Sequence, residues 1–165
     1  MIYFTYDELV SFAESNGIKV IDTKAAFPLS GAYADNAIFM NPSLLKTSKE
    51  KRCVFVEELG HHYCTVGNIL DQRKPENRKQ EKIARAWAYE RFVPLGGILV
   101  AYWSGVKSRY ELADYLNITE SFLQEALDYY KGKYGPYHAM GNNLICFEPL
   151  AIIKANKRKK YAKGR

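Results

Sequence analysis

Hydrophobic and polar positions along the first part of the chain predict one helix followed by short strands. Residues 5–17 have apolar positions at helical spacing, a Thr-x-x-Glu capping box at the start and Gly17 at the end. Residues 18–22 are predicted as a strand. Residues 29–34 and 37–41 flank an Asp-Asn pair, which is typical of a tight turn, so they are predicted to form a hairpin.

The rest of the chain has mainly helical patterns. One long helix is expected from Thr47 or Ser48 to Cys64, and a second is expected to begin at Pro75 and to end before Pro94. The remaining predicted elements are a helix at 99–103, a helix-turn-helix pattern over 110–130, and a hairpin formed by 137–140 and 144–148. Several helices beside a few short strands indicate the α+β class.

The composition suits one packed domain, because 47 % of the 165 residues are hydrophobic and 14 % are aromatic. We place this domain at residues 1–150. The formal net charge of +6 depends on residues 151–165, which carry seven Lys and Arg side chains; without them it would be −1. This basic tail is expected to be flexible and solvated, with contact to nucleic acid or another acidic surface as the alternative.

Three cysteines, an odd number without the spacing of a disulfide framework, suit reduced thiols. The N-terminal residues lack the basic and apolar regions of a signal peptide, and no apolar run is long enough to span a membrane. The sequence therefore predicts a soluble cytoplasmic protein.

The candidate chemistry lies in the predicted long helix, where residues 57–61 read Glu-Glu-Leu-Gly-His, close to the H-E-x-x-H pattern of zincin peptidases. Side chains four residues apart lie on one helix face, so Glu57 and His61 can reach the same metal ion. Glu58 stands at the position of the general base. The alternatives are an exposed helix acid at Glu57 and a salt bridge at Glu58.

A third metal ligand is expected from the helix that begins at Pro75. Glu81 is the best candidate, because the small residues Ala84 and Ala88 allow a close approach to a neighbouring helix and a carboxylate on a packed face needs a partner. Its alternative partner is Arg85, four residues later. The expected metal is Zn²⁺, with Mn²⁺ as the alternative because a carboxylate replaces one nitrogen ligand.

These two segments resemble the motifs of the ImmA/IrrE family of metallopeptidases. The family has HELGHH on one helix, where this chain has EELGHH at residues 57–62. Further along it has a pattern of the form E-x-E-A-N-x-F-A-A-x-L-L-M-P, and residues 81–94 here read EKIARAWAYERFVP. The resemblance extends over about residues 5–150. It implies a zincin-like core, with the motif helix packed beside a small antiparallel sheet.

Two positions depart from the family pattern. Glu57 stands at the first His, and Ile83 stands at the second acid, which leaves Glu81 as the acidic ligand from its helix. The EELGHH form is typical of a mobile-element branch of the family. The site residues that the resemblance implies are the metal ligands Glu57, His61 and Glu81, the catalytic base Glu58 and, as a hydrogen-bonding neighbour of the ligands, His62.

The resemblance also implies a function. Family members in prophages and integrative elements cut or remove a helix-turn-helix repressor encoded beside them. The implied activity is a metal-dependent endopeptidase that hydrolyses a peptide bond of such a repressor, with Glu58 taking a proton from water. The rival hypothesis is a non-catalytic antirepressor that binds the repressor without cutting it. Glu57 separates the two, because weak metal binding favours the rival.

The helix-turn-helix pattern at residues 110–130 raises the question of DNA binding. Its second helix carries Glu120, Glu125 and Asp128 but no Arg, and this charge opposes contact with phosphates. We therefore do not expect direct DNA binding. A packing role, or a platform on which the repressor docks, fits this segment better.

Overall fold

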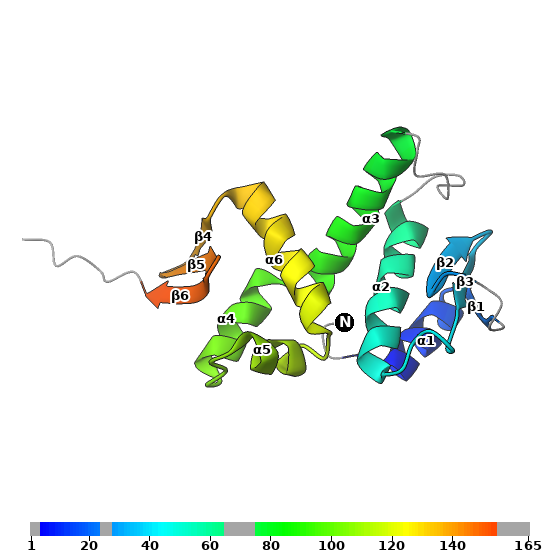
Figure 1. The fold of residues 1–165 in the computed structure, drawn as a ribbon, viewed down its shortest axis with the longest axis horizontal. Helices are drawn as coiled ribbons and strands as arrows, with labels where there is room; N and C mark the ends of the chain where they lie inside the picture. The colour runs from blue at the N-terminus through cyan, green and yellow to red at the C-terminus, as the bar shows by residue number, and fades with distance from the viewer. Residues whose placement is uncertain (1–3, 24–27, 65–74, 155–165) are drawn as a thin grey trace, which may run out of the picture.

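A computed structural model describes residues 4–23, 28–64 and 75–154 of the chain. The elements follow one another in the order α1 (Tyr6–Ser15), β1 (Lys19–Asp22), β2 (Gly31–Ala34), β3 (Ala37–Met40), α2 (Ser48–Cys64), α3 (Pro75–Phe92), α4 (Leu95–Trp103), α5 (Arg109–Tyr115), α6 (Glu120–Tyr134), β4 (Tyr137–Met140), β5 (Asn143–Phe147) and β6 (Leu150–Lys154) (Figure 1). Helices and small sheets occur together, so the α+β class predicted from the sequence is confirmed.

The first helix forms where its capping signals predict. The Thr5 hydroxyl accepts a hydrogen bond from the Glu8 amide, and the Glu8 carboxylate accepts one from the Thr5 amide at 2.7 Å. These two bonds satisfy amides that the first turn of a helix leaves without partners. Gly17 follows the helix with a φ of +79°, a conformation that favours glycine, and turns the chain into β1.

The first sheet has the strand order β1-β3-β2. The predicted hairpin is confirmed: β2 and β3 pair antiparallel, and Asp35 and Asn36 both have positive φ in the turn between them. Strand β1 joins the other side of β3 in parallel, which local patterns did not indicate. Ile38 and Met40 of the central strand are buried, and β2 is left at the edge of the sheet.

The motif helix α2 lies between this sheet and α3 (Figure 1). It spans Ser48–Cys64, as predicted, and α3 begins at Pro75, also as predicted. Gly60 lets the two helices approach closely, because a Cβ at this position would collide with the carbonyl oxygen of Ala84. The loop predicted at Gly67-Asn68 lies outside the described residues.

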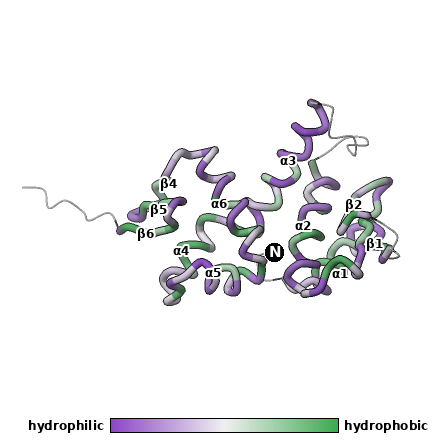
Figure 2. The backbone as a smooth tube through the Cα atoms, in the orientation of Figure 1, coloured by the Kyte–Doolittle hydropathy of each residue, from purple (hydrophilic) through white to green (hydrophobic). Residues whose placement is uncertain are grey.

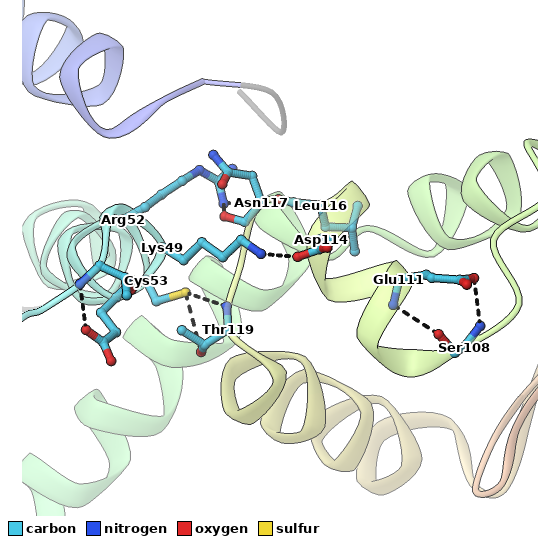
Figure 3. Close-up of polar contacts among 11 residues, drawn as sticks. Lys49, Arg52, Cys53, Ser108, Glu111, Asp114, Leu116, Asn117 and Thr119 are labelled. Carbon is cyan, nitrogen blue, oxygen red and sulfur yellow. Dashed lines mark hydrogen bonds and ion pairs between the residues drawn. The ribbon is translucent and has the colours of Figure 1, made fainter.

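The first half of α2 is joined to the helix-turn-helix segment, which forms as α5 and α6 (Figure 3). The buried Arg52 guanidinium donates hydrogen bonds to the carbonyl oxygens of Leu116 at 3.2 Å and Asn117 at 2.9 Å. The Cys53 thiol accepts one from the Thr119 amide at 3.4 Å. The turn between α5 and α6 is therefore attached directly to the helix that carries the motif.

The C-terminal part differs from the prediction in two elements. Helix α4 begins at Leu95, four residues before the predicted start at 99. The hairpin of β4 and β5 is confirmed, and a third strand, β6, extends it as an antiparallel sheet of order β4-β5-β6. Strand β6 crosses the boundary at residue 150 where the basic tail was expected to begin; residues 155–165 lie outside the described residues.

One cluster of buried apolar side chains connects α1, the first sheet, the helices and β5. Helix α4 is predominantly hydrophobic, whereas the first turns of α3 are hydrophilic (Figure 2). In the described part of the chain, no helix combines the length and the apolar character needed to cross a membrane. The hydrophilic start of α3 lies next to α2, where the motif residues lie.

Candidate functional site

The residues of the sequence motif lie in the second half of α2. Glu58 and His61 are buried, with 9 % and 8 % of their surface exposed, and Glu57 is partly buried. All three line one cavity of about 650 Å³. Because residues four apart share a helix face, Glu57 and His61 are placed one turn from each other on the side that faces this cavity.

Helix α3 contributes Glu81 to the same cavity. Its Oε2 lies 3.2 Å from Nε2 of His61, so the two helices bring these side chains into direct contact. The contact depends on the close packing of Gly60 against Ala84, which sets the spacing of α2 and α3. The close approach of the two helices that the small residues of α3 indicated is confirmed, and the role of Glu81 as a metal ligand stays a prediction.

The edge strand β2 forms the opposite wall. Gly31 lies against the motif helix, because a Cβ there would overlap Val54 and would lie 3.0 Å from Oε1 of Glu58. A glycine is thus required for the strand to approach the Glu58 carboxylate. The complete lining of the cavity is Leu29, Ser30, Gly31, Ala32, Tyr33, Glu57, Glu58, His61, Arg78, Glu81, Lys82 and Arg85.

The carboxylates of the cavity have strongly perturbed acidities. Burial raises the pKa of Glu57 and of Glu58 to about 7, so both carboxylates hold a proton more readily than a solvent-exposed glutamate does. The hydrogen bond from His61 lowers the pKa of Glu81 to about 2, so Glu81 is fully ionised. Burial opposes the charge on His61, but the bond to Glu81 and the neighbouring carboxylates raise its pKa above the ordinary value.

Arg85 is the main cation among these acids. Its Nε donates a hydrogen bond to Oε1 of Glu81 at 2.7 Å, and its Nη1 lies 3.6 Å from Oε2 of Glu125 on α6. Of the charges that act on Glu57, that of Arg85 has the largest effect and opposes the influence of burial. The pair with Arg85 that the sequence offered as the alternative for Glu81 is present, and the other oxygen of Glu81 contacts His61.

His62 lies on another side of α2. Its Nδ1 is 2.9 Å from the hydroxyl of Tyr33 on β2, and its ring contacts the rings of Tyr33 and Tyr63 edge-on. It is not among the residues that line the cavity. Tyr33 lines the cavity, and its hydrogen bond with His62 connects that histidine to the wall of the site.

The donor atoms fit a metal ion in type and, for two of them, in spacing. Two ligands of a tetrahedral metal at about 2.0–2.1 Å from the ion lie about 3.3 Å apart, and the His61 and Glu81 atoms are 3.2 Å apart. In the described ranges, no group of three or more His, Cys, Asp or Glu side chains is yet arranged to hold a metal. A third donor would have to come from Glu57, one helical turn before His61.

The sequence indicated no role for Arg85 beyond pairing with Glu81, and it did not predict that Gly31 or Glu125 would lie at the site. One signal for Arg85 was present: aligned on the final Pro, it stands where the similar pattern has Asn. Glu125 had no such signal, because it comes from α6 and reaches Arg85 only in the folded chain. Ile83, at the position of the missing acid, is 43 % exposed and does not line the cavity.

A protein-family model matches the larger part of the chain. The model of the IrrE N-terminal-like domain, Peptidase_M78, matches residues 13–128, from the end of α1 to the middle of α6. No curated protein and no solved structure matches the chain. The matched range contains the whole cavity and ends before β4, so the second sheet lies outside it.

Proposed function

The chain belongs to the IrrE N-terminal-like domain family of peptidases, and from this premise we propose that it is a metal-dependent endopeptidase that cleaves a regulatory protein. The observation that carries the proposal is the meeting of His61 and Glu81, 3.2 Å apart, beside Glu58 in one open cavity. Two potential metal donors and a potential base from two helices thus face the space that a peptide could enter.

Glu57, His61 and Glu81 would hold the metal. One imidazole and two carboxylates suit Zn²⁺, and the two oxygen donors also suit Mn²⁺. When bound, such an ion supplies a Lewis acid and lowers the pKa of a coordinated water. The chain's own part is to fix these donors: Glu81 by its contacts with His61 and Arg85, and His61 by its burial in α2.

Glu58 is proposed as the general base. Its carboxylate is buried beside Gly31 and faces the same cavity as the ligands. Because burial raises its pKa to about 7, it can accept a proton from the attacking water and give it to the leaving amine nitrogen at neutral pH. A base of ordinary carboxylate acidity would accept the proton of the water less readily at this pH.

The proposed substrate is a helix-turn-helix repressor of a prophage or integrative element, which the chain would meet in the cytoplasm. The proposal follows from the motifs that resemble the ImmA/IrrE family. The chain's own helix-turn-helix segment does not compete for DNA in this scheme, because Glu125 of α6 faces Arg85 and Tyr89 of α3. These contacts use the segment for packing.

A second function, a non-catalytic antirepressor, is favoured by one observation. Arg85 holds an oxygen of Glu81 and is the strongest opposite charge on Glu57, so two of the three proposed ligands already have a cation beside them. If a metal ion never displaced Arg85 from these carboxylates, the protein would retain the cavity but could not hydrolyse a peptide bond. It would act by binding the repressor alone.

The test is to load the purified protein with Zn²⁺ or Mn²⁺, add the helix-turn-helix protein encoded beside its gene, and follow fragments by mass spectrometry. Wild type should cut at a defined bond. Glu58→Gln should retain the metal and lose about 10²–10⁴-fold in rate. Stable complex formation without any fragment, for wild type with bound metal, would exclude the peptidase and support the antirepressor.

A further inference from the structure

Arg85 lies among carboxylates that come from three different helices. Its guanidinium bonds Glu81 of its own helix at 2.7 Å and lies 3.6 Å from Glu125 of α6. It also lines the cavity that contains Glu57 of α2, and the charges of Glu57 and Glu81 outweigh burial and raise the pKa of Arg85 above its ordinary value. Glu57 in turn lines a second cavity, of about 320 Å³, together with Glu125.

The acids of the cavity explain why a cation is needed here. Glu57 of α2 and Arg85 of α3 lie on different helices but face one cavity. Of the charges that act on the Glu57 carboxylate, that of Arg85 has the largest effect. The two charges therefore compensate each other locally, as an acid and a base brought together by the packing of α2 on α3.

A divalent metal at His61 and Glu81 would have to share this space with the guanidinium. Like charges within a few ångströms repel by several kcal/mol at the effective dielectric of a partly buried site. Glu81 offers one oxygen to His61 and the other to Arg85, so a metal that used both oxygens would have to displace Arg85. The Arg85 side chain is 44 % exposed, and solvent can receive it when it leaves.

We propose that Arg85 is an internal counter-cation that competes with the divalent metal for Glu57 and Glu81, so that metal occupancy requires the guanidinium to move away. The inference rests on the metal ligands named in the proposed function, and it adds Arg85 as a residue that regulates how much metal they bind. Glu125 is the acceptor that can retain Arg85 after it leaves Glu81, because it is already within 3.6 Å. A shift of the Arg85 guanidinium toward Glu125 of α6 would therefore favour metal binding by Glu57 and Glu81.

The test compares metal affinity of the chelator-treated full chain and its variants by titration with Zn²⁺ in a calorimeter. Arg85→Gln removes the competing charge and should bind Zn²⁺ at least about tenfold more tightly than wild type. Arg85→Lys keeps the charge and should remain within about threefold of wild type. Lys82→Gln is the matched control: it makes the same charge change on the same helix and lines the same cavity, and should change the affinity by less than about threefold.

Thermal unfolding followed by circular dichroism gives a second readout that does not depend on activity. Without metal, Arg85→Gln should unfold at a lower temperature than wild type, because Glu57 and Glu81 lose their counter-cation. Saturating Zn²⁺ should raise its unfolding temperature by more than it raises that of wild type. A variant that has failed to fold would show no cooperative transition, and Arg85→Lys, which keeps the charge, then supplies the comparison.

The outcomes separate this inference from the proposed function. Equal or weaker Zn²⁺ binding by Arg85→Gln overturns the competition and makes Arg85 a residue that orients Glu81. If wild type binds Zn²⁺ and Arg85→Gln binds it no more tightly, the proposed metal centre is supported and the competition with Arg85 is excluded. Binding by Arg85→Gln together with none by wild type supports the competition and argues against a resident metal in the natural protein.

Discussion

Two arginines beside the motif helix α2 are held in opposite ways. In the first half, the fully buried Arg52 donates to the carbonyl oxygens of Phe4, Leu116 and Asn117, and its guanidinium lies over the ring of Phe92. Beside the second half, the partly exposed Arg85 faces carboxylates in a cavity. Carbonyl dipoles fix a cation in place, whereas carboxylates also attract other cations. One arginine therefore holds the fold together, and the other lies where ions can exchange.

The largest expected effect separates these two roles. Arg52→Met should destabilise the protein by about 3 kcal/mol, because it removes one buried and two partly buried hydrogen bonds to carbonyl oxygens. Arg85→Met should cost less than about 1 kcal/mol, as expected for a partly exposed ion pair. Urea unfolding of the metal-free variants measures both. An equal loss from the two substitutions would contradict the distinction between the two halves.

A smaller effect is expected where α2 and α3 touch. Gly60→Ala should destabilise the fold by about 2 kcal/mol, because the new methyl group meets the backbone of Ala84 and must push the helices apart. The same change should weaken Zn²⁺ binding, since it separates His61 from Glu81. Gly132→Ala in α6, where a methyl group has open space, is the control and should stabilise the helix by up to about 1 kcal/mol. Unfolding and titration of both variants check this, and a neutral Gly60→Ala would show that the helix spacing does not set the site.

The smallest effect concerns the wall formed by β2. Tyr33→Phe removes the hydrogen bond to His62 at 2.9 Å and keeps the ring contacts. It should cost about 1 kcal/mol in unfolding free energy and leave Zn²⁺ affinity within about threefold, because His62 does not line the cavity. A tenfold loss of affinity in the same titration would place His62 closer to the metal than this account does.

Local signals were enough to predict much of the first half of the fold. The capping box of Thr5 and Glu8, the Asp35-Asn36 turn and the bounds of α2 all depend on residues close in sequence. The start of α4 was wrong for a physical reason: Gly96 and Gly97 have low helix propensity, yet Gly97 packs closely against Pro94 and Leu116, and the tertiary contact outweighs the propensity.

The site was predictable where its chemistry lies in motifs and not where it depends on packing. Glu57, Glu58, His61 and Glu81 were all named from the sequence, and all four line one cavity. The approach of β2 through Gly31 and the link from Arg85 to Glu125 could not be predicted, because each joins segments far apart in the chain. The parallel pairing of β1 with β3 belongs to the same class of long-range contact.

The central claim, a metal held between α2 and α3, is tested most directly by the metal content and Zn²⁺ affinity of the purified wild type beside His61→Ala and Glu81→Ala. The account predicts about one metal ion per chain in the wild type and a loss of at least about 100-fold in affinity in each variant. No binding by the wild type in excess Zn²⁺ or Mn²⁺, or binding that both substitutions leave unchanged, would contradict it.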